Sequence, residues 1–400
     1  MSNSFSADFP EIWAKEQQEI FYKENVAMQV ADTSFKSEMS FWDTLNRPYR
    51  SANAVQSYTR GTAITINDKT DTQEQLSVNK QFADGFYVDD FDKIQSRYDL
   101  IAAYARDGWE YLSNIVDSDV LGEYVNAASI VDDGDIGWTA GNGIALSTTN
   151  VLKTISAAKK SLRKLNISAT DLFGVISPEF EDILIQYGAG RDTTMWDNAN
   201  EKGAVMNFYG FDLYVSNQTS GTAVLTMATV PTATNTVVIN WVTFTAVTTI
   251  GTAAWNFLIG TADATRANLA GLINDPTTTS STQVALSTED AKVFANQITA
   301  TNDDTADTLT VIAKWVGTLT VSETLADAAD IWTAVNQVQH NLFGKRWATT
   351  LVMQSDARPQ VKQVPDKLGV NILNGVLYWV KTFADGAKKL VDVQIKSSTF

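Results

Sequence analysis

The chain has 400 residues and a formal net charge of −16, with 30 basic residues against 46 acidic ones. A chain of this length exceeds what one hydrophobic core usually serves, so we expect two or three domains. The acidic balance excludes the broad cationic surface that binds nucleic-acid phosphates. The absence of cysteine excludes disulfides, cysteine-ligated zinc and thiol nucleophiles. No apolar run approaches the roughly 20 residues of a membrane-spanning helix, so we expect no membrane partner.

Residues 1–52 combine short helical patterns with large apolar side chains, among them Trp13, Phe21 and Trp42. An arm with so many exposed apolar groups needs a surface to bind, either on its own domain or on a neighbouring copy. The opening residues lack the basic and apolar regions of a signal peptide, so we expect synthesis in a reducing cytoplasm.

Residues 53–88 alternate in the manner of strands. Arms at 54–66 and 75–88 flank a polar, turn-forming stretch at 67–71, which predicts a long hairpin. The hairpin has too few apolar side chains to build a core, and an isolated two-stranded ribbon is marginal in water. We therefore expect it to lie on a neighbouring subunit, with Ile64 and Ile66 in the contact.

Three helices follow the hairpin. Apolar residues at three- and four-residue spacing over 91–117 predict a long helix, in which Gly108 permits a bend. A second helix at 150–165 carries five basic residues outside its apolar stripe, and a solvated face explains them better than a nucleic-acid contact. After a short buried strand at 175–176, Ser177 is placed as the N-cap of a third helix that ends at Gly188.

From residue 219 to 333 the composition changes to threonine and alanine. Between Gly203 and Ala262 only Asp212 carries a formal charge. Strands are expected at 237–245, 293–300, 308–316 and 318–322, with a helix at 261–274. The segment is predicted to be an independent α+β domain inserted into a host domain, which resumes with strands at 348–354, 376–380 and 390–395.

Little in the chain suggests catalysis. His340 is the one histidine, and neither a nucleophile-elbow motif nor a phosphate-binding loop is present. We therefore assign no catalytic, cofactor-binding or metal-binding residue. Two acidic stretches, 132–135 and 302–307, contain carboxylates suited to calcium, but they lack the spacing of a calcium loop with its distal glutamate. Turns explain them better.

The ordered set of parts resembles the coat-protein fold of Hong Kong 97-type tailed phages. The resemblance rests on Val175-Ile176-Ser177-Pro178, on the strand from Gly210-Phe211 to Ser216-Asn217, and on the closing strands around Leu351-Val352-Met353-Gln354 and Leu377-Tyr378-Trp379-Val380. It implies an α+β fold with an N-terminal arm (1–52), an extended loop (53–88), a peripheral domain with a spine helix (89–145 and 366–400), an axial domain (146–218 and 334–365) and an insertion domain (219–333).

The resemblance also implies a function. A member of this family is a major capsid protein, which self-assembles as pentamers and hexamers into an icosahedral shell around double-stranded DNA. Expected partners are other copies of the chain, a portal protein and a separate scaffolding protein, with DNA enclosed without sequence-specific binding. The expected location is the virion, after synthesis in the bacterial cytoplasm. Alternatives are the shell of an encapsulin-like compartment and a phage surface adhesion protein. In the capsid interpretation, Trp13, Phe21, Trp42, Ile64 and Ile66 are the predicted inter-subunit contacts.

Overall fold

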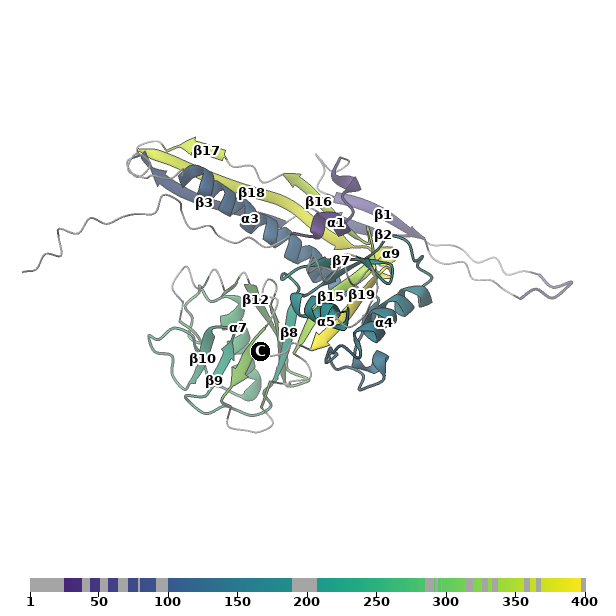
Figure 1. Cartoon of the computed structure of the whole chain (residues 1–400). Helices are drawn as coiled ribbons and strands as arrows, with labels where there is room; N and C mark the ends of the chain where they lie inside the picture. Colours follow the sequence, from purple (N-terminus) through teal and green to yellow (C-terminus); the bar gives the residue numbers. More distant parts are fainter. Residues whose placement is uncertain are drawn as a thin grey trace, which may run out of the picture.

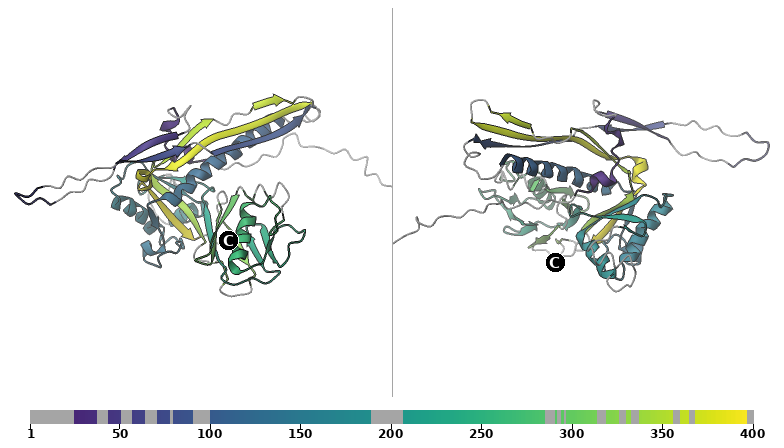
Figure 2. Two further views of the ribbon diagram at one scale, coloured as in Figure 1. Left: turned by 180° about the vertical axis from the view of Figure 1, so that it is seen from behind. Right: turned by 45° about the horizontal axis from the view of Figure 1, so that its top comes forward.

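The computed structural model in Figure 1 describes most of the chain. The described residues are 25–37, 44–50, 57–63, 71–77, 80–90, 100–188, 207–284, 291, 294–295, 297–313, 319–325, 330–332, 337–355, 360–364 and 368–396. A long sheet lies along one helix, a second and larger sheet lies at one end of that helix, and a further lobe extends from the edge of the second sheet (Figure 1, Figure 2).

The long sheet is built on β18 (Gly369–Thr382). On one side β18 pairs with β3 (Lys80–Asp89), and on the other with β16 (Thr349–Ser355) and β17 (Gln360–Gln363), all antiparallel. Helix α3 (Leu100–Leu121) packs against β18 and β3. It corresponds to the predicted spine helix, and its buried Leu112 and Val116 belong to the predicted apolar stripe, whereas Trp109 is 38% exposed.

The second sheet has nine strands among the described residues. Its middle contains β15 (Val338–Lys345), β5 (Leu172–Ile176) and β7 (Phe211–Val215), with β6 (Asn207–Phe208) at one end. β19 (Leu390–Lys396) pairs with β15 and with β4 (Ser129–Val131). Helices α4 (Val151–Lys164) and α5 (Pro178–Gly188) share an apolar core with this sheet.

At the other end of the nine-stranded sheet, β8 (Gly221–Thr226) leads into the predicted insert. It pairs with β13 (Thr308–Ala313), which pairs with β12 (Ile298–Asp303). A second insert sheet contains β11 (Asn256–Leu258), β10 (Val242–Val247), β9 (Thr236–Ile239) and β14 (Val321–Glu323). With α7 (Ala262–Asn274) these strands enclose their own hydrophobic core, drawn from residues 223–332.

Several predicted elements of the insert appear where the pattern placed them. Helix α7 begins after Thr261, whose hydroxyl accepts a hydrogen bond from the Ala264 amide at 3.2 Å. The strand predicted at 237–245 is instead a hairpin of β9 and β10. Asn240 turns the chain with a left-handed backbone, at φ 53°, a conformation that asparagine tolerates better than most residues.

The predicted hairpin at 53–88 has a different register. β1 (Thr44–Arg50) pairs with β2 (Asp71–Ser77), with Arg50 opposite Asp71. A turn lies at 59–62, where the Thr62 amide bonds the Thr59 carbonyl at 3.1 Å. Gly61 takes a φ of 90° there, which suits glycine. Of the turn predicted at 67–71 only Asp71 is among the described residues, and it begins β2. The second predicted arm divides, since residues 80–88 belong to β3 and pair within their own chain.

The predicted division of the closing strands also needs correction. We expected 334–365 in the axial domain and 366–400 in the peripheral domain. Instead β15 and β19 lie together in the nine-stranded sheet, while β16 to β18 form the long sheet. The reason is two local changes of direction, at Trp347, with φ 64°, and at the short helix α9 (Ala384–Ala387). Each moves the chain from one sheet to the other.

The two sheets share a core with α3. One apolar cluster joins them, with residues from α1 (Ala27–Val30), α3, β18 and the face of β5 that carries Phe173 and Val175. Short 3₁₀ turns complete the connections: Ser34–Lys36, Gly122–Asn126 directly after α3, and Asp133–Ile136 before α4. The N-terminal segment 25–32 is therefore part of the folded body.

Candidate assembly site

A two-stranded ribbon, made of β1 and β2 with the described residues 57–63 of their connection, is the first surface that assembly could use. Its base is packed onto the body. Leu76 is fully buried beside Val352 and Phe383, and Leu45 and Trp379 pack against them. The described tip, 57–63, is exposed throughout, with Tyr58 at 62%. The ribbon base is therefore buried against the body, whereas the described tip is exposed and open to contact with another molecule.

Charged groups reinforce the ribbon base. The Arg47 Nη2 atom lies 2.9 Å from Asp385 Oδ2, and the guanidinium carbon lies 5.1 Å from the centre of the Phe383 ring. Lys381 reaches the same ring at 5.5 Å and donates to the Gln75 carbonyl. Partial burial would raise the pKa of Asp385, but the charges of Lys389 and Arg47 outweigh that effect and hold the pKa below its usual value.

Helix α3 is tied to the long sheet by polar contacts as well as by its core. Asp119 accepts hydrogen bonds from Lys80 at 2.7 Å and from the Tyr378 hydroxyl at 2.5 Å. Burial, followed by the charge of Asp119, raises the pKa of Tyr378 well above its usual value. Gly108 allows close approach, because a Cβ there would lie 2.3 Å from the Asn374 amide nitrogen. The glycine therefore serves helix–sheet contact.

Beside α3 lies an apolar groove of about 170 Å³. Its lining combines the N-terminal segment, α3 and the long sheet: Asn25, Ala27, Met28, Lys36, Trp109, Leu112, Ser113, Val116, Asp117, Met353 and Val376. Met28 is 61% exposed and Trp109 is 38% exposed. Asp117 fixes the wall formed by the N-terminal segment, since its Oδ1 accepts the amides of Val26 at 2.8 Å and of Ala27 at 2.5 Å.

The predicted contact residues Trp13, Phe21, Trp42, Ile64 and Ile66 all lie outside the described residues. The structure adds two surfaces that the sequence pattern did not single out, namely the groove and the ribbon base. Trp109 was predicted in the buried stripe of its helix, and the other walls of the groove come from distant segments, so the sequence carried no signal for it.

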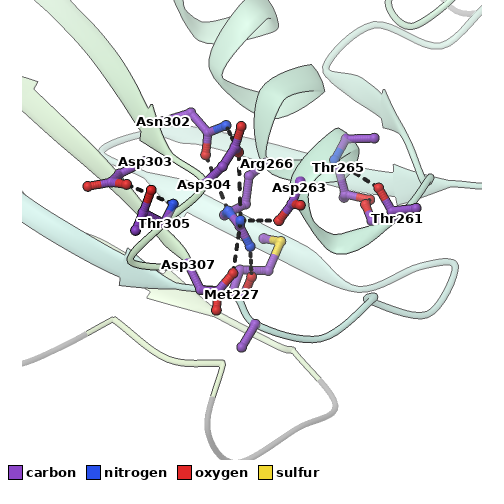
Figure 3. Close-up of polar contacts among 12 residues, drawn as sticks. Met227, Thr261, Asp263, Thr265, Arg266, Asn302, Asp303, Asp304, Thr305 and Asp307 are labelled. Carbon is purple, nitrogen blue, oxygen red and sulfur yellow. Dashed lines mark hydrogen bonds and ion pairs between the residues drawn. The ribbon is translucent and has the colours of Figure 1, made fainter.

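The acidic stretch 302–307, predicted as a turn, packs against the buried side chain of Arg266 (Figure 3). Arg266 of α7 is fully buried; it contacts Asp263, lies 3.0 Å from Asp307 Oδ1 and donates to the Met227 carbonyl. Asp304 Oδ1 is 3.7 Å away, and Asp303 instead accepts the amides of its own turn. Three partly exposed carboxylates thus compensate one buried charge, which would be costly if left alone. Among the described residues no cluster of three histidine or carboxylate groups is arranged to hold a metal.

His340, which the sequence left as a structural or exposed residue, is 6% exposed on β15. Its Nδ1 lies 2.8 Å from Asp392 Oδ2, and its Nε2 lies 3.1 Å from the Thr222 hydroxyl. Its ring stacks on Tyr124 with the ring centres 3.8 Å apart. The Thr222 hydroxyl is a nucleophile-type group, and with Asp392 it completes the carboxylate–imidazole–hydroxyl order of a triad, built here around a buried ring. Within the described part of the chain, no helix is long and apolar enough to cross a membrane.

Comparison with solved structures gives a consistent result for the fold. No protein-family model and no curated protein sequence matches the chain. A structure from Mycobacterium phage Che8 aligns with a TM-score of 0.58 at 14% identity, covering 97% of this chain and 98% of its own. The capsid of cyanophage P-SCSP1u gives a TM-score of 0.53 at 11% identity, covering 100% of this chain and 96% of its own.

This chain has the fold of a phage capsid protein. The capsid asymmetric unit of cyanophage Pam1 supports the same conclusion, with a TM-score of 0.53 at 10% identity and coverage of 100% of this chain and 99% of the other. The α+β fold predicted from the sequence agrees with these capsid structures, which are consistent with the Hong Kong 97 type. At such low sequence identity, structural similarity establishes the fold alone, and the function has to be argued separately.

Proposed function

We propose that this chain is the major capsid protein of a tailed phage and self-assembles into the icosahedral shell around its double-stranded DNA. The observation that carries the proposal is the near-complete overlap, in both directions, with capsid structures of two cyanophages. A fold by itself does not fix a function. The anchored ribbon with its exposed tip supports the proposal, because the tip is open to contact with another subunit.

Assembly would use surfaces that one subunit leaves exposed. The ribbon tip at 57–63 projects from an anchored base, and the groove beside α3 is apolar and partly open. A contact between two different surfaces of identical chains is heterologous, and it generates a ring when the rotation between subunits closes and an open filament when it does not. Many such contacts, each modest, stabilise a closed shell together. We propose Trp13, Phe21 and Trp42 of the arm and Ile64 and Ile66 of the ribbon as further contact residues.

The charge of the chain suits a container. A net charge of −16 gives little electrostatic affinity for phosphate, so DNA can be packed and released without being held. The proposed partners are therefore other copies of the chain in pentamers and hexamers, a portal protein for DNA entry, and a separate scaffolding protein. The proposed location is the virion, after synthesis in the host cytoplasm.

The proposed work of the chain is mechanical rather than catalytic. Catalysis near neutral pH usually uses a group that titrates there and reaches a substrate. His340 is 6% exposed and its ring contacts Tyr124, Asp392 and Thr222, which favours a structural role for it over a catalytic one. The insert, proposed as residues 219–333, extends from the edge of the nine-stranded sheet (Figure 1). We propose that it projects outward from the shell wall, where there is room for an additional lobe.

The proposal is tested by producing the full chain in bacteria, alone and with a candidate scaffolding protein, and examining it by negative-stain microscopy. Closed shells of uniform size are expected. The matched variant replaces Ile64 and Ile66 by Asp, and it should remain folded while forming no shells. Soluble monomers under both conditions would contradict the proposed function. Normal shells from the double variant would contradict only the proposed contact through the ribbon.

A further inference from the structure

The chain enters the insert through an unusually polar and buried segment, residues 216–222. Ser216, Gln218, Thr219 and Ser220 are each at most 2% exposed. Gly221 and Thr222 then pair with Gln339 and Val338 of β15. Buried polar groups cost free energy unless they are hydrogen-bonded, so the partners of this segment determine where it can lie.

One set of partners is on the nine-stranded sheet. The Ser220 carbonyl accepts the His340 amide at 2.9 Å, and Gln339 Nε2 donates to the Thr219 hydroxyl at 3.1 Å. The His340 ring bridges Thr222 of the insert to Asp392 of β19. It also stacks on Tyr124, in the 3₁₀ turn that directly follows α3. A single imidazole therefore contacts the insert, the sheet and the turn after the spine helix.

A second set of partners is on α3 and the N-terminal segment. Gln218 Nε2 donates to Asn114 Oδ1 of α3 at 3.1 Å and to Asn25 Oδ1 at 2.9 Å. Asn25 in turn donates to Ser113 Oγ on α3 at 2.8 Å. If the N-terminal segment moved away from α3, the buried Gln218 would lose one of its two acceptors. The docking of Asn25 and the placement of the insert therefore share a hydrogen bond.

We propose that residues 216–222 and His340 form a joint that couples the insert to the spine helix and to the N-terminal segment 25–32. In this joint His340 and Gln218 are positioning residues. A displacement of the N-terminal segment is then transmitted to the first strand of the insert, and the reverse effect follows because coupling free energies are reciprocal. The inference concerns the single chain and does not depend on shell formation.

The test is hydrogen–deuterium exchange on the purified full-length chain, with two variants. Thr222→Val removes the hydroxyl that bonds His340 while keeping the shape of the side chain. Asn25→Ala removes the acceptor of Gln218 from a segment that is far away in sequence. Each should speed exchange in β8 (221–226) by about fivefold, the size expected when one buried hydrogen bond is lost. Exchange in β10, inside the insert core, should not change.

Two control variants share the segments but not the joint. Thr243→Val makes the same isosteric change on an exposed face of the insert, and Met28→Ala truncates an exposed side chain of the N-terminal segment. Both should leave exchange in β8 at the wild-type rate. The proposal is overturned if Asn25→Ala speeds exchange only in 25–32 and α3. It is equally overturned if the control variants change β8 as much as the joint variants do. If Thr222→Val does not fold, the Asn25→Ala comparison decides the question alone.

Discussion

Phe383 is the residue through which the anchoring of the ribbon can be measured. Its side chain is 1% exposed and packs with Leu76 of β2 and Val352 of β16. Arg47 of β1 and Lys381 of β18 lie 5.1 Å and 5.5 Å from the ring centre. Phe383→Ala removes the apolar contact and both cation–ring contacts together. Phe383→Leu is the matched control, because it keeps most of the apolar volume and removes only the ring.

The expected magnitudes differ between the two variants. Truncating a buried phenylalanine to alanine costs about 3–5 kcal/mol. A swap between large apolar side chains costs less than about 1.5 kcal/mol, and each exposed cation–ring contact adds roughly 0.5–1 kcal/mol. We therefore expect Phe383→Leu to cost about 1–3 kcal/mol and Phe383→Ala clearly more. The loss should appear first in β1 and β2, since their attachment depends on this cluster.

The assay is hydrogen–deuterium exchange in β1 and β2 under native conditions, combined with a thermal melt. An increase over the wild-type exchange rate in the ribbon base, with no increase in the insert core, would show local release of the ribbon. Shell yield should fall in the same order, with Phe383→Ala lowest. If β1 and β2 exchange at the wild-type rate in Phe383→Ala, Phe383 does not anchor the ribbon. Equal losses in both variants would also contradict the prediction, because apolar packing would then not be the main contribution.

Four further predictions address other parts of the chain. Gly108→Ala should lower the melting temperature and cost about 1–3 kcal/mol of stability, because its Cβ would lie 2.3 Å from Asn374 Nδ2 and 2.5 Å from Asp84 Oδ2; replacing both Asn374 and Asp84 by Ala should restore part of the loss, and no rescue would contradict the proposed close approach. The pKa of Asp385 is lower in the folded chain, so its contribution should be complete above the unfolded value of about 3.9 and disappear as the pH falls through the folded pKa. Ribbon exchange followed from pH 6 to pH 3 checks this, and Asp385→Asn should flatten the profile. Trp42→Ala should leave the monomer folded by circular dichroism and prevent shells by microscopy, and normal shells would remove this residue from the contact. A fragment of residues 219–333 should melt cooperatively, whereas a flat melt would mean that the insert needs the nine-stranded sheet.

Much of the fold could be predicted because local chemistry determined it. The apolar spacing over the second predicted helix gives α4, with Ile155, Ala158 and Leu162 buried as expected. Ser177 lies at the start of α5, where its hydroxyl accepts the Phe180 amide at 3.3 Å. In each case the signal lies within a few residues of the element that it predicts, so no knowledge of distant contacts was required.

The errors arose where distant parts of the chain decide the outcome. The polar stretch 67–71 has good turn composition, yet Asp71 begins β2 and pairs with Arg50 of β1, and a turn lies at 59–62. Strand β3 reads as a hairpin arm, but β18 is its partner across almost 300 residues of sequence. His340 shows no motif because its partners Thr222, Tyr124 and Asp392 come from three separate segments. The groove likewise combines three segments, so no single stretch of sequence could reveal it.

Copies of this chain are expected to form a closed shell through the surfaces that one copy leaves exposed. Cryo-electron microscopy of particles from cells that express the full-length chain can show this. Icosahedral shells are expected in which the fold described above repeats, with the ribbon tip at 57–63 in contact with an adjacent subunit. Particles without icosahedral symmetry, or shells in which that tip contacts only its own chain, would contradict it.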